Sequence, residues 1–162
     1  MAGQARPALY ERGSVVTDDE VALSKTAGQK FEYVGETGQS LIMQLVKNVS
    51  GGALLPRTCV KYDLDAMGTH VDGAATATAR PAGIVDQDLP AAGVANLKWF
   101  LIAVEGIHDC LAGSSFLVGE DLVSVAAGEV DNGSHTFFYI GRAVEAAAAQ
   151  ADAKQVLLKL IG

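Results

Sequence analysis

Hydrophobic residues recur along this chain in short runs that are separated by turn-forming residues. From Leu41 onward, each run is three to nine residues long, and Gly, Asp, Asn or Pro stands between the runs. Alternation of apolar and polar positions within such short runs is typical of β-strands. The predicted strands cover 41–46, 53–55, 58–64, 83–85, 96–104, 115–118, 121–125, 136–144 and 155–161. Many short strands in succession predict an all-β barrel or sandwich.

The segment 142–155 departs from this pattern. Its residues, RAVEAAAAQADAKQ, have high intrinsic helix propensity. We therefore expect one short helix, or a helical turn, between two strands at this point. The expected fold class is all-β with at most one short helix.

Residues 1–38 differ in composition from the rest of the chain. Charged residues and scattered glycines dominate, and the apolar pieces are as short as Val15–Val16 and 31–34. A segment with so little apolar surface is expected to be an arm that a partner surface orders. The predicted organisation is an extended N-terminal arm, 1–38, followed by a β domain, 39–162.

The β domain carries a weak internal repeat. The stretch 49–73 resembles 111–133, because both pass from small residues through two apolar residues to an alternating strand and a turn. In the same way, 83–106 resembles 141–162, and both stretches end in an apolar strand that contains Lys. The similarity predicts two β units, at about 41–106 and 107–162.

Composition limits the partners of the chain. Its 162 residues are 49% hydrophobic but only 6% aromatic, which suits a core built mostly of small side chains. The net charge of -7 repels a phosphate backbone, so nucleic acid is not an expected partner. The most apolar stretch, 94–107, contains charged residues and is too short for a bilayer, so no membrane partner is expected. Without an apolar secretory segment, the chain is expected to be soluble and made in the cytoplasm.

Metal-binding motifs are incomplete. Cys59 and Cys110 lack the spacing of a zinc or redox motif and are expected to be buried thiols without a disulfide. His108 stands near Cys110, but no second ligand pair follows, so no metal is expected. The run 63–68 begins like a calcium loop, but Met67 replaces an oxygen ligand. The three histidines are expected at the surface or partly buried.

Catalytic motifs are equally incomplete. Ser114 and Ser115 lack the spacing of a nucleophile elbow, and the glycine-rich stretches contain no phosphate-binding loop. The paired carboxylates are expected in solvated turns rather than as an acid and a base; they are Asp18 with Asp19, Asp86 with Asp88, and Glu120 with Asp121. No cofactor and no enzymatic activity are predicted.

Neighbouring aromatic residues leave two interpretations open. In Trp99–Phe100 and Phe137–Tyr139, adjacent rings point to opposite faces of a strand. Either the strand is buried on both faces, or one ring is reserved for a contact between subunits.

The C-terminal third of the chain carries a family resemblance. The strand LVSV (122–125) leads through AAGEVDNG to FYIGRAVEAAAA (138–149) and to a last apolar strand, QVLLKLI (155–161). This order resembles the small decoration, or cement, proteins of tailed bacteriophage capsids. The resemblance covers 110–162 directly and 50–106 only through the internal repeat. It implies a compact β-barrel-like or β-tulip-type domain, often trimeric, that sits outside an assembled head and clamps its capsomers.

The resulting hypothesis is a homotrimeric virion protein on the outer surface of the head. It stabilises the head by bridging major capsid protein subunits. Arg6, Tyr10 and Arg12 in the arm are predicted to contact the capsid, and Tyr139 to lie at the protomer interface. One alternative is a tail or fibre-associated β module that binds a receptor or glycan. Another is a small trimeric nucleotide hydrolase, although the serine and aspartate set that it needs around a Gly turn is not seen.

Overall fold

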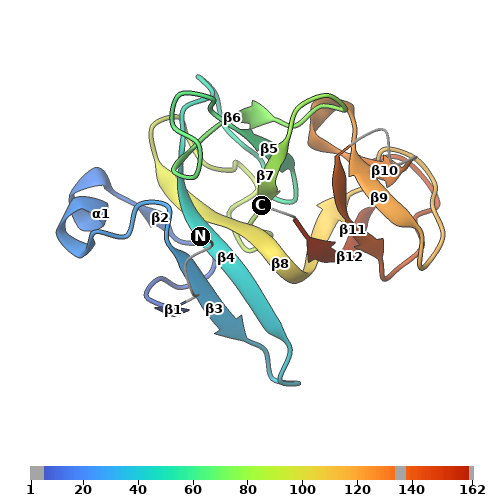
Figure 1. Ribbon diagram of the computed structural model, residues 1–162, viewed down its shortest axis with the longest axis horizontal. Helices are drawn as coiled ribbons and strands as arrows, with labels where there is room; N and C mark the ends of the chain where they lie inside the picture. Colours follow the sequence, from blue (N-terminus) through green and yellow to red (C-terminus); the bar gives the residue numbers. More distant parts are fainter. Residues whose placement is uncertain (1–5, 134–137, 161–162) are drawn as a thin grey trace.

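The computed structural model describes residues 6–133 and 138–160, and strands make up most of its regular structure (Figure 1). In chain order, the elements are β1 (Arg6–Pro7), β2 (Val15–Val16), α1 (Asp18–Ser24), β3 (Lys30–Val34), β4 (Ser40–Asn48), β5 (Cys59–Tyr62), β6 (His70–Ala74), β7 (Pro81–Val85), β8 (Trp99–Leu111), β9 (Asp121–Ser124), β10 (Val130–Asn132), β11 (Tyr139–Ala143) and β12 (Ala153–Lys159). A turn of 3-10 helix lies at Ala126–Gly128. The predicted all-β class is confirmed.

The strands β4 to β8 close a first barrel. β4 pairs with β6 in parallel. The antiparallel pairs β6 with β5, β5 with β7 and β7 with β8 follow, and β8 then returns to pair with β4. This closure gives each of the five strands a neighbour on both sides. Val46, Val60, Phe100 and Ile102 belong to the hydrophobic cluster of this barrel.

The strands β8 to β12 close a second barrel, on the right of Figure 1. β8 pairs with β12, β12 with β11, β11 with β9, and β9 with β10, all antiparallel. A parallel bridge between Ala112, just after β8, and Val130 of β10 completes the ring. Leu122, Ile140 and Val156 are fully buried among its strands.

The two barrels share β8, which is thirteen residues long. Its first half pairs with β4 and β7, and its second half pairs with β12. Glu105 stands at the change of partner, because it pairs with both Ile42 and Lys159. Trp99 and Phe100 pack in different hydrophobic clusters. This strand is therefore buried on both faces, as one of the two interpretations of its adjacent rings predicted.

The strand pairing of the first barrel recurs in the second. Val60 of β5 pairs with Gly83, and Leu122 of β9 pairs with Gly141. Both ladders shift register at the neighbouring residue, so a β-bulge occurs at the same place in each barrel. A Cβ atom at either glycine would collide with a backbone carbonyl of the next strand. Close backbone approach therefore requires glycine at both positions.

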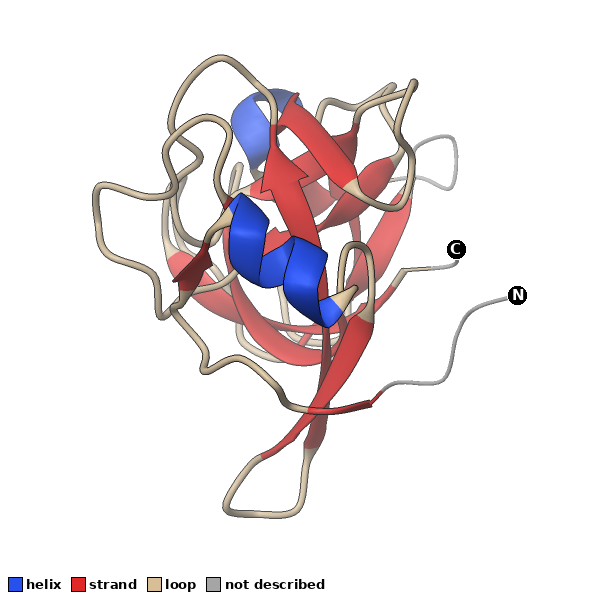
Figure 2. Ribbon diagram, turned by 90° about the vertical axis from the view of Figure 1, so that its left-hand side faces the viewer, coloured by secondary structure: helices blue, strands red, loops and turns tan. Residues whose placement is uncertain are grey.

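The N-terminal segment packs on the first barrel. β1 pairs with β3, β3 with β4, and β2 with β8. Thr17 and Glu20 form a capping box that starts α1, which lies on the outside of the strands (Figure 2). Val21 and Phe31 are buried in the core. Because its few apolar residues meet the outer face of the barrel, this segment packs on its own chain, whereas an extended arm was expected.

The prediction of a helix at 142–155 is wrong. β11 continues to Ala143, and β12 begins at Ala153. Between these strands, Ala147 makes a β-bridge to Phe116. Helix propensity is a weak preference, and strand pairing on both sides leaves too few residues for a stable helix.

The observed strands also differ from the predicted strands at several short segments. Leu54 and Phe116, in two predicted strands, each make a single β-bridge, to Val94 and Ala147. β6 and β10 were not predicted, because polar residues interrupt both segments and glycine also interrupts β6. These strands form where a neighbouring strand supplies hydrogen bonds, which depends on the fold rather than on local sequence.

Candidate binding groove between the barrels

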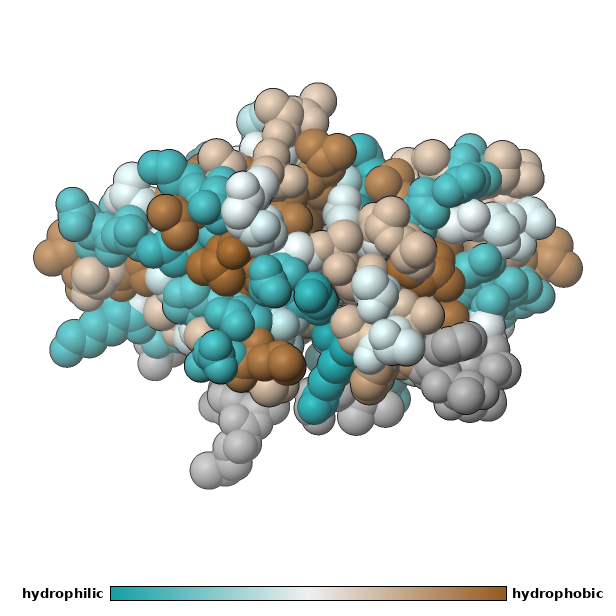
Figure 3. Space-filling view, turned by 90° about the horizontal axis from the view of Figure 1, so that it is seen from above, coloured by the Kyte–Doolittle hydropathy of each residue, from teal (hydrophilic) through white to brown (hydrophobic). Residues whose placement is uncertain are grey.

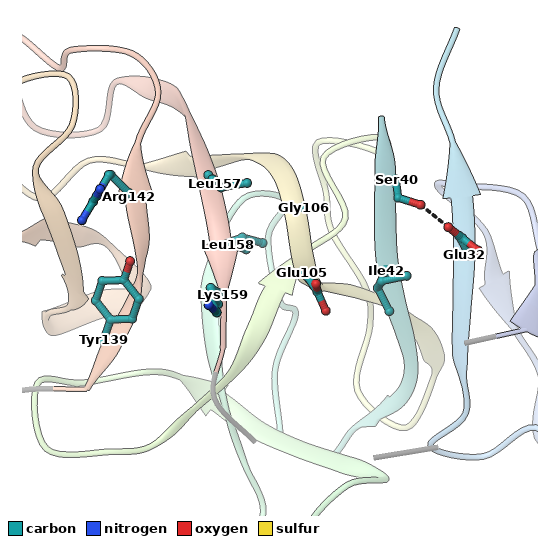
Figure 4. A pocket seen from close by; sticks show the side chains of 10 residues that line it. All are labelled: Glu32, Ser40, Ile42, Glu105, Gly106, Tyr139, Arg142, Leu157, Leu158 and Lys159. Atoms are coloured by element: carbon teal, nitrogen blue, oxygen red, sulfur yellow. Dashed lines mark hydrogen bonds between the residues drawn. The ribbon is translucent and has the colours of Figure 1, made fainter. Parts of the chain in front are cut away.

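A groove lies where the two barrels meet. One side is formed by β11 and β12, the other by β3 and β4, and β8 passes between them (Figure 4). Its volume is about 740 Å³. The lining residues are Glu32, Ser40, Ile42, Glu105, Gly106, Tyr139, Arg142, Leu157, Leu158 and Lys159.

The change of partner along β8 positions the groove. β4 pairs with β8 as far as Glu105, and β12 pairs with β8 from Glu105 onward. Gly106 has a φ of +102°, a conformation that favours glycine. A side chain there would collide with the backbone of Ser40. Glycine therefore lets β4 lie close to β8 at the point where the second barrel begins.

The groove combines apolar surface with charged side chains of both signs, including Glu105 of the central strand β8. Ile42, Tyr139 and Leu157 supply the apolar surface, and Leu157 is 49% exposed. Glu32 lies on the β3 side and Arg142 on the β11 side (Figure 4). Apolar burial supplies affinity, and charges on opposite sides favour one direction for an extended segment. The arrangement suits recognition of another protein chain.

Local contacts orient the charged side chains. The Ser40 hydroxyl donates a hydrogen bond to the Glu32 carboxylate. Arg142 donates to Asp121 Oδ1 from Nε and from Nη2, each at 3.1 Å. The Arg142 side chain nevertheless remains 60% exposed. It can therefore contact a partner without losing its internal hydrogen bonds.

The predicted contact residues have different surroundings. Tyr139 lines the groove. Arg6 lies in β1, whose backbone pairs with β3. The Tyr10 hydroxyl is 2.9 Å from Ser24 Oγ and 2.8 Å from Thr26 Oγ1, so it joins the N-terminal segment to the end of α1. The capsid contacts assigned to Arg6, Tyr10 and Arg12, and the protomer contact assigned to Tyr139, stay predictions.

Arg12 contacts a buried carboxylate. Its Nη2 is 3.2 Å from Asp86 Oδ1 and 3.0 Å from Asp88 Oδ2. The Gly13 N–H donates to Asp86 Oδ2 at 2.6 Å, and His108 Nε2 lies 3.9 Å from Oδ1. The Asp86 side chain is 1% exposed, so the prediction of a solvated turn is wrong for this residue. The cluster fastens the N-terminal segment to the loop after β7.

The surroundings of Asp86 favour its charged form. Burial alone would raise the pKa of this carboxyl. The His108 ring and the N–H groups of Gly13 and Asp88 lower it, and so does the positive charge of Arg12. The lowering contacts prevail, so the pKa of Asp86 lies below its ordinary value.

The two cysteines that the sequence offers as candidate ligands lie in the core of the protein. Cys59 and Cys110 are buried free thiols, as predicted, and burial raises the pKa of Cys59 to about 12. His108 is 2% exposed, so the prediction of a surface or partly buried histidine is wrong for this residue. His135 and Phe137 lie outside the described residues. Within 6–133 and 138–160, no three His, Cys, Asp or Glu side chains gather as a metal site. No helix in those ranges has the length and apolarity to cross a membrane.

The charged residues of the groove were not singled out from the sequence. Glu32 falls in the expected arm, Arg142 in the expected helix, and Lys159 in a terminal strand. Strand alternation does contain one usable signal. Leu157 and Lys159 occupy outward positions of β12, between buried residues. An outward leucine on a predicted strand therefore marks the apolar surface of the groove.

Comparison with known proteins identifies a fold. No protein-family model matches the chain, and no curated protein matches it in sequence. Among solved structures, the N base of the head fibre gp8.5 of bacteriophage phi29 is similar, with a TM-score of 0.53 at 14% identity. The match covers 74% of this chain and 94% of that one. The chain shares its fold with a phage head fibre base.

Proposed function

We propose that this chain is a structural protein of a bacteriophage virion, bound to the outside of the assembled head. The observation that carries the proposal is the fold shared with a phage head fibre base, which extends over 94% of that chain. The resemblance of 110–162 to cement proteins supports the same role. A fold alone hosts many functions, so the surface of this chain has to supply the binding chemistry.

The groove between the barrels is proposed to bind an extended segment of the major capsid protein. Leu157 and Tyr139 offer apolar surface that such a segment covers. Glu32 and Arg142, on opposite sides, favour one direction of binding. An apolar centre with a polar rim is the usual composition of a specific interface.

Binding of this chain to the assembled head would stabilise the head through thermodynamic linkage. A protein that binds the assembled lattice, and not free subunits, shifts the equilibrium toward the lattice. A homotrimer would bridge several capsid subunits at once, and its linked contacts raise the effective concentration of each site. The proposed role is structural and includes no catalytic step.

A fibre-associated role is the second candidate, because a solved structure with a similar fold is a fibre base. In that role, the chain itself would be a fibre-associated β module that binds a receptor or glycan. Copy number separates the two candidates. A decoration protein is present in proportion to capsid subunits, whereas a fibre component is present in few copies.

The test is the amount of this chain in purified virions, measured by quantitative mass spectrometry against the major capsid protein. A fixed ratio close to that of capsid subunits supports decoration. A handful of copies per particle supports the fibre role. Absence from the virion overturns the proposal.

The groove is tested with Leu157→Glu, titrated onto heads that lack the chain. Leu157 is half exposed, so the variant retains its fold while a charge enters the apolar surface. We expect at least about tenfold weaker binding. Leu23→Glu, at an exposed leucine of α1, is the control and should bind as wild type does. Equal binding of L157E and wild type contradicts the role of the groove.

A further inference from the structure

The chain contains three asparagines, and one of them is followed by glycine. The three pairs are Asn48 with Val49, Asn96 with Leu97, and Asn132 with Gly133. The side-chain amide of an asparagine can react with the backbone nitrogen of the residue that follows it. Glycine hinders this reaction least, because it has no Cβ atom and the widest choice of backbone conformations. Asn132 and Gly133 therefore form the most reactive of the three pairs.

Asn132 stands at the exposed end of a short strand. It is the last of the three residues of β10, and it pairs with Leu122 of β9. Its side chain is exposed, and its Nδ2 donates a hydrogen bond to Glu120 Oε2 at 3.2 Å. An exposed strand end opens more readily than the core of a protein. The side chain and backbone at Asn132 can therefore reach the conformation in which they react.

The other two asparagines are held by backbone groups. Asn48 is fully buried, and its Nδ2 donates to the carbonyl oxygens of Gly52 at 2.8 Å and Val94 at 2.9 Å. Asn96 Oδ1 accepts a hydrogen bond from the Gly51 N–H at 3.0 Å. A reaction at either residue has to break such contacts first, and at Asn48 it would leave polar groups unpaired in the core. These two residues are therefore controls within the same chain.

We infer that Asn132 is a site of spontaneous deamidation. The Gly133 backbone nitrogen, after losing its proton to solvent, attacks Asn132 Cγ. A bond forms between these two atoms, the bond from Cγ to Nδ2 breaks, and Nδ2 leaves as ammonia with protons from solvent. Water then opens the succinimide ring at either carbonyl, which gives aspartate or isoaspartate at position 132. The net reaction consumes water and releases ammonia, without oxidation or reduction.

The product carries a new negative charge beside two other carboxylates. Asn132 and Gly133 line a surface hollow together with Glu120 and Asp121. Deamidation removes the hydrogen bond from Nδ2 to Glu120 and places a like charge near it, which weakens the pairing of β10 with β9. Figure 3 shows hydrophilic residues spread among apolar ones over one face of the molecule, and an exposed carboxylate at position 132 is solvated in the same way. The rest of the protein therefore stays folded.

The test incubates the purified protein in neutral and in mildly alkaline buffer and follows its peptides by mass spectrometry. The peptide that contains Asn132 should gain the mass that separates a hydroxyl group from an amino group. The gain should be faster in the alkaline buffer, because the attack needs a deprotonated backbone nitrogen. The peptides that contain Asn48 and Asn96 should keep their mass. The reaction needs only this chain and water, so the outcome does not depend on the proposed function.

Asn132→Gln is the blocking variant, because the longer side chain would have to close a larger ring. Asn96→Gln is its matched control. On ion exchange, N96Q should acquire the more acidic form as wild type does, whereas N132Q should not. Gly133 is left unchanged, because a Cβ atom there would collide with the Val123 side chain. If the wild-type peptide that contains Asn132 keeps its mass, or if N132Q becomes acidic as fast as wild type, the inference fails.

Discussion

Asp86 holds a negative charge out of contact with water, and the fold tolerates this because several donors face the carboxylate. The shortest contact is from a backbone N–H, at 2.6 Å. The Arg12 guanidinium supplies a counter-charge at 3.2 Å. The titratable or charged groups around Asp86 are Arg12, Asp88, His108 and Tyr33. A buried charge of this kind is strongly destabilising only when its partner is removed.

Asp86→Asn is expected to lower the free energy of unfolding by about 2 kcal/mol, because Arg12 loses the buried one of its two counter-charges and the Gly13 N–H loses a charged acceptor. The pKa of Asp86 is lower in the folded state than its ordinary value. The carboxylate therefore stabilises the fold above about pH 4, and this stabilisation is lost as the pH falls through the lowered pKa. The measurement is denaturant unfolding of wild type and D86N at a series of pH values.

The difference between these two proteins should be constant between about pH 5 and 8 and should shrink in acid below about pH 4. Asp88→Asn is a useful control, because the Asp88 side chain is 47% exposed and its charge pair with Arg12 is only partly buried. We expect a smaller loss from this variant. A difference that grows as the solution becomes more acidic contradicts the assignment.

The helix α1 is only seven residues long, and a helix of that length is not stable alone in water. Contacts with the first barrel stabilise it. Asp18 Oδ1 accepts a hydrogen bond from Lys47 Nζ at 2.8 Å and from Trp99 Nε1 at 2.6 Å. These two hydrogen bonds lower the pKa of Asp18. The Lys47 ammonium also lies 5.8 Å from the centre of the Trp99 ring.

Asp18→Ala is expected to release α1 while both barrels stay folded. Trp99 is the single tryptophan and is 7% exposed, so its emission should shift to longer wavelength when α1 leaves. Far-ultraviolet circular dichroism should keep its strand signal. Asp19→Ala, in the same helical turn, is the matched control and should leave the emission unchanged. An unshifted emission in D18A shows that these hydrogen bonds do not hold the helix.

At the scale of the molecule, β8 makes the two barrels one cooperative unit. Separate domains are joined by linkers that few contacts cross. Here the same strand contributes hydrogen bonds to β4 and β7 in one barrel and to β12 in the other. Unfolding either barrel therefore removes a strand from its neighbour. We expect a single unfolding transition for the whole chain.

Leu122→Ala tests this coupling, because Leu122 is fully buried among the strands of the second barrel, whereas Trp99 lies at the start of β8, where it pairs with Lys47 of β4. We expect a loss of about 3 kcal/mol from the cavity, seen equally by Trp99 emission and by circular dichroism. Val60→Ala, at the corresponding position of the first barrel, should likewise shift both signals together. A Trp99 transition that does not move in L122A means that the barrels unfold independently.

Local sequence determined the strand class and most strand positions of this protein. The strands β4, β5, β7, β8, β9, β11 and β12 overlap predicted runs, because alternating apolar residues suit a pleated surface whatever its partner. Burial of Cys59 and Cys110 was equally predictable, because isolated thiols usually pack as small hydrophobes.

Tertiary structure alone decided how these strands close and what they bring together. The pairing of Glu105 with both Ile42 and Lys159, which places the groove, joins residues from distant parts of the chain. The pairing of Arg12 with Asp86, which fastens the N-terminal segment, does the same. No local pattern encodes such pairs, because their energy comes from hydrogen bonds and burial that exist only after the chain has folded.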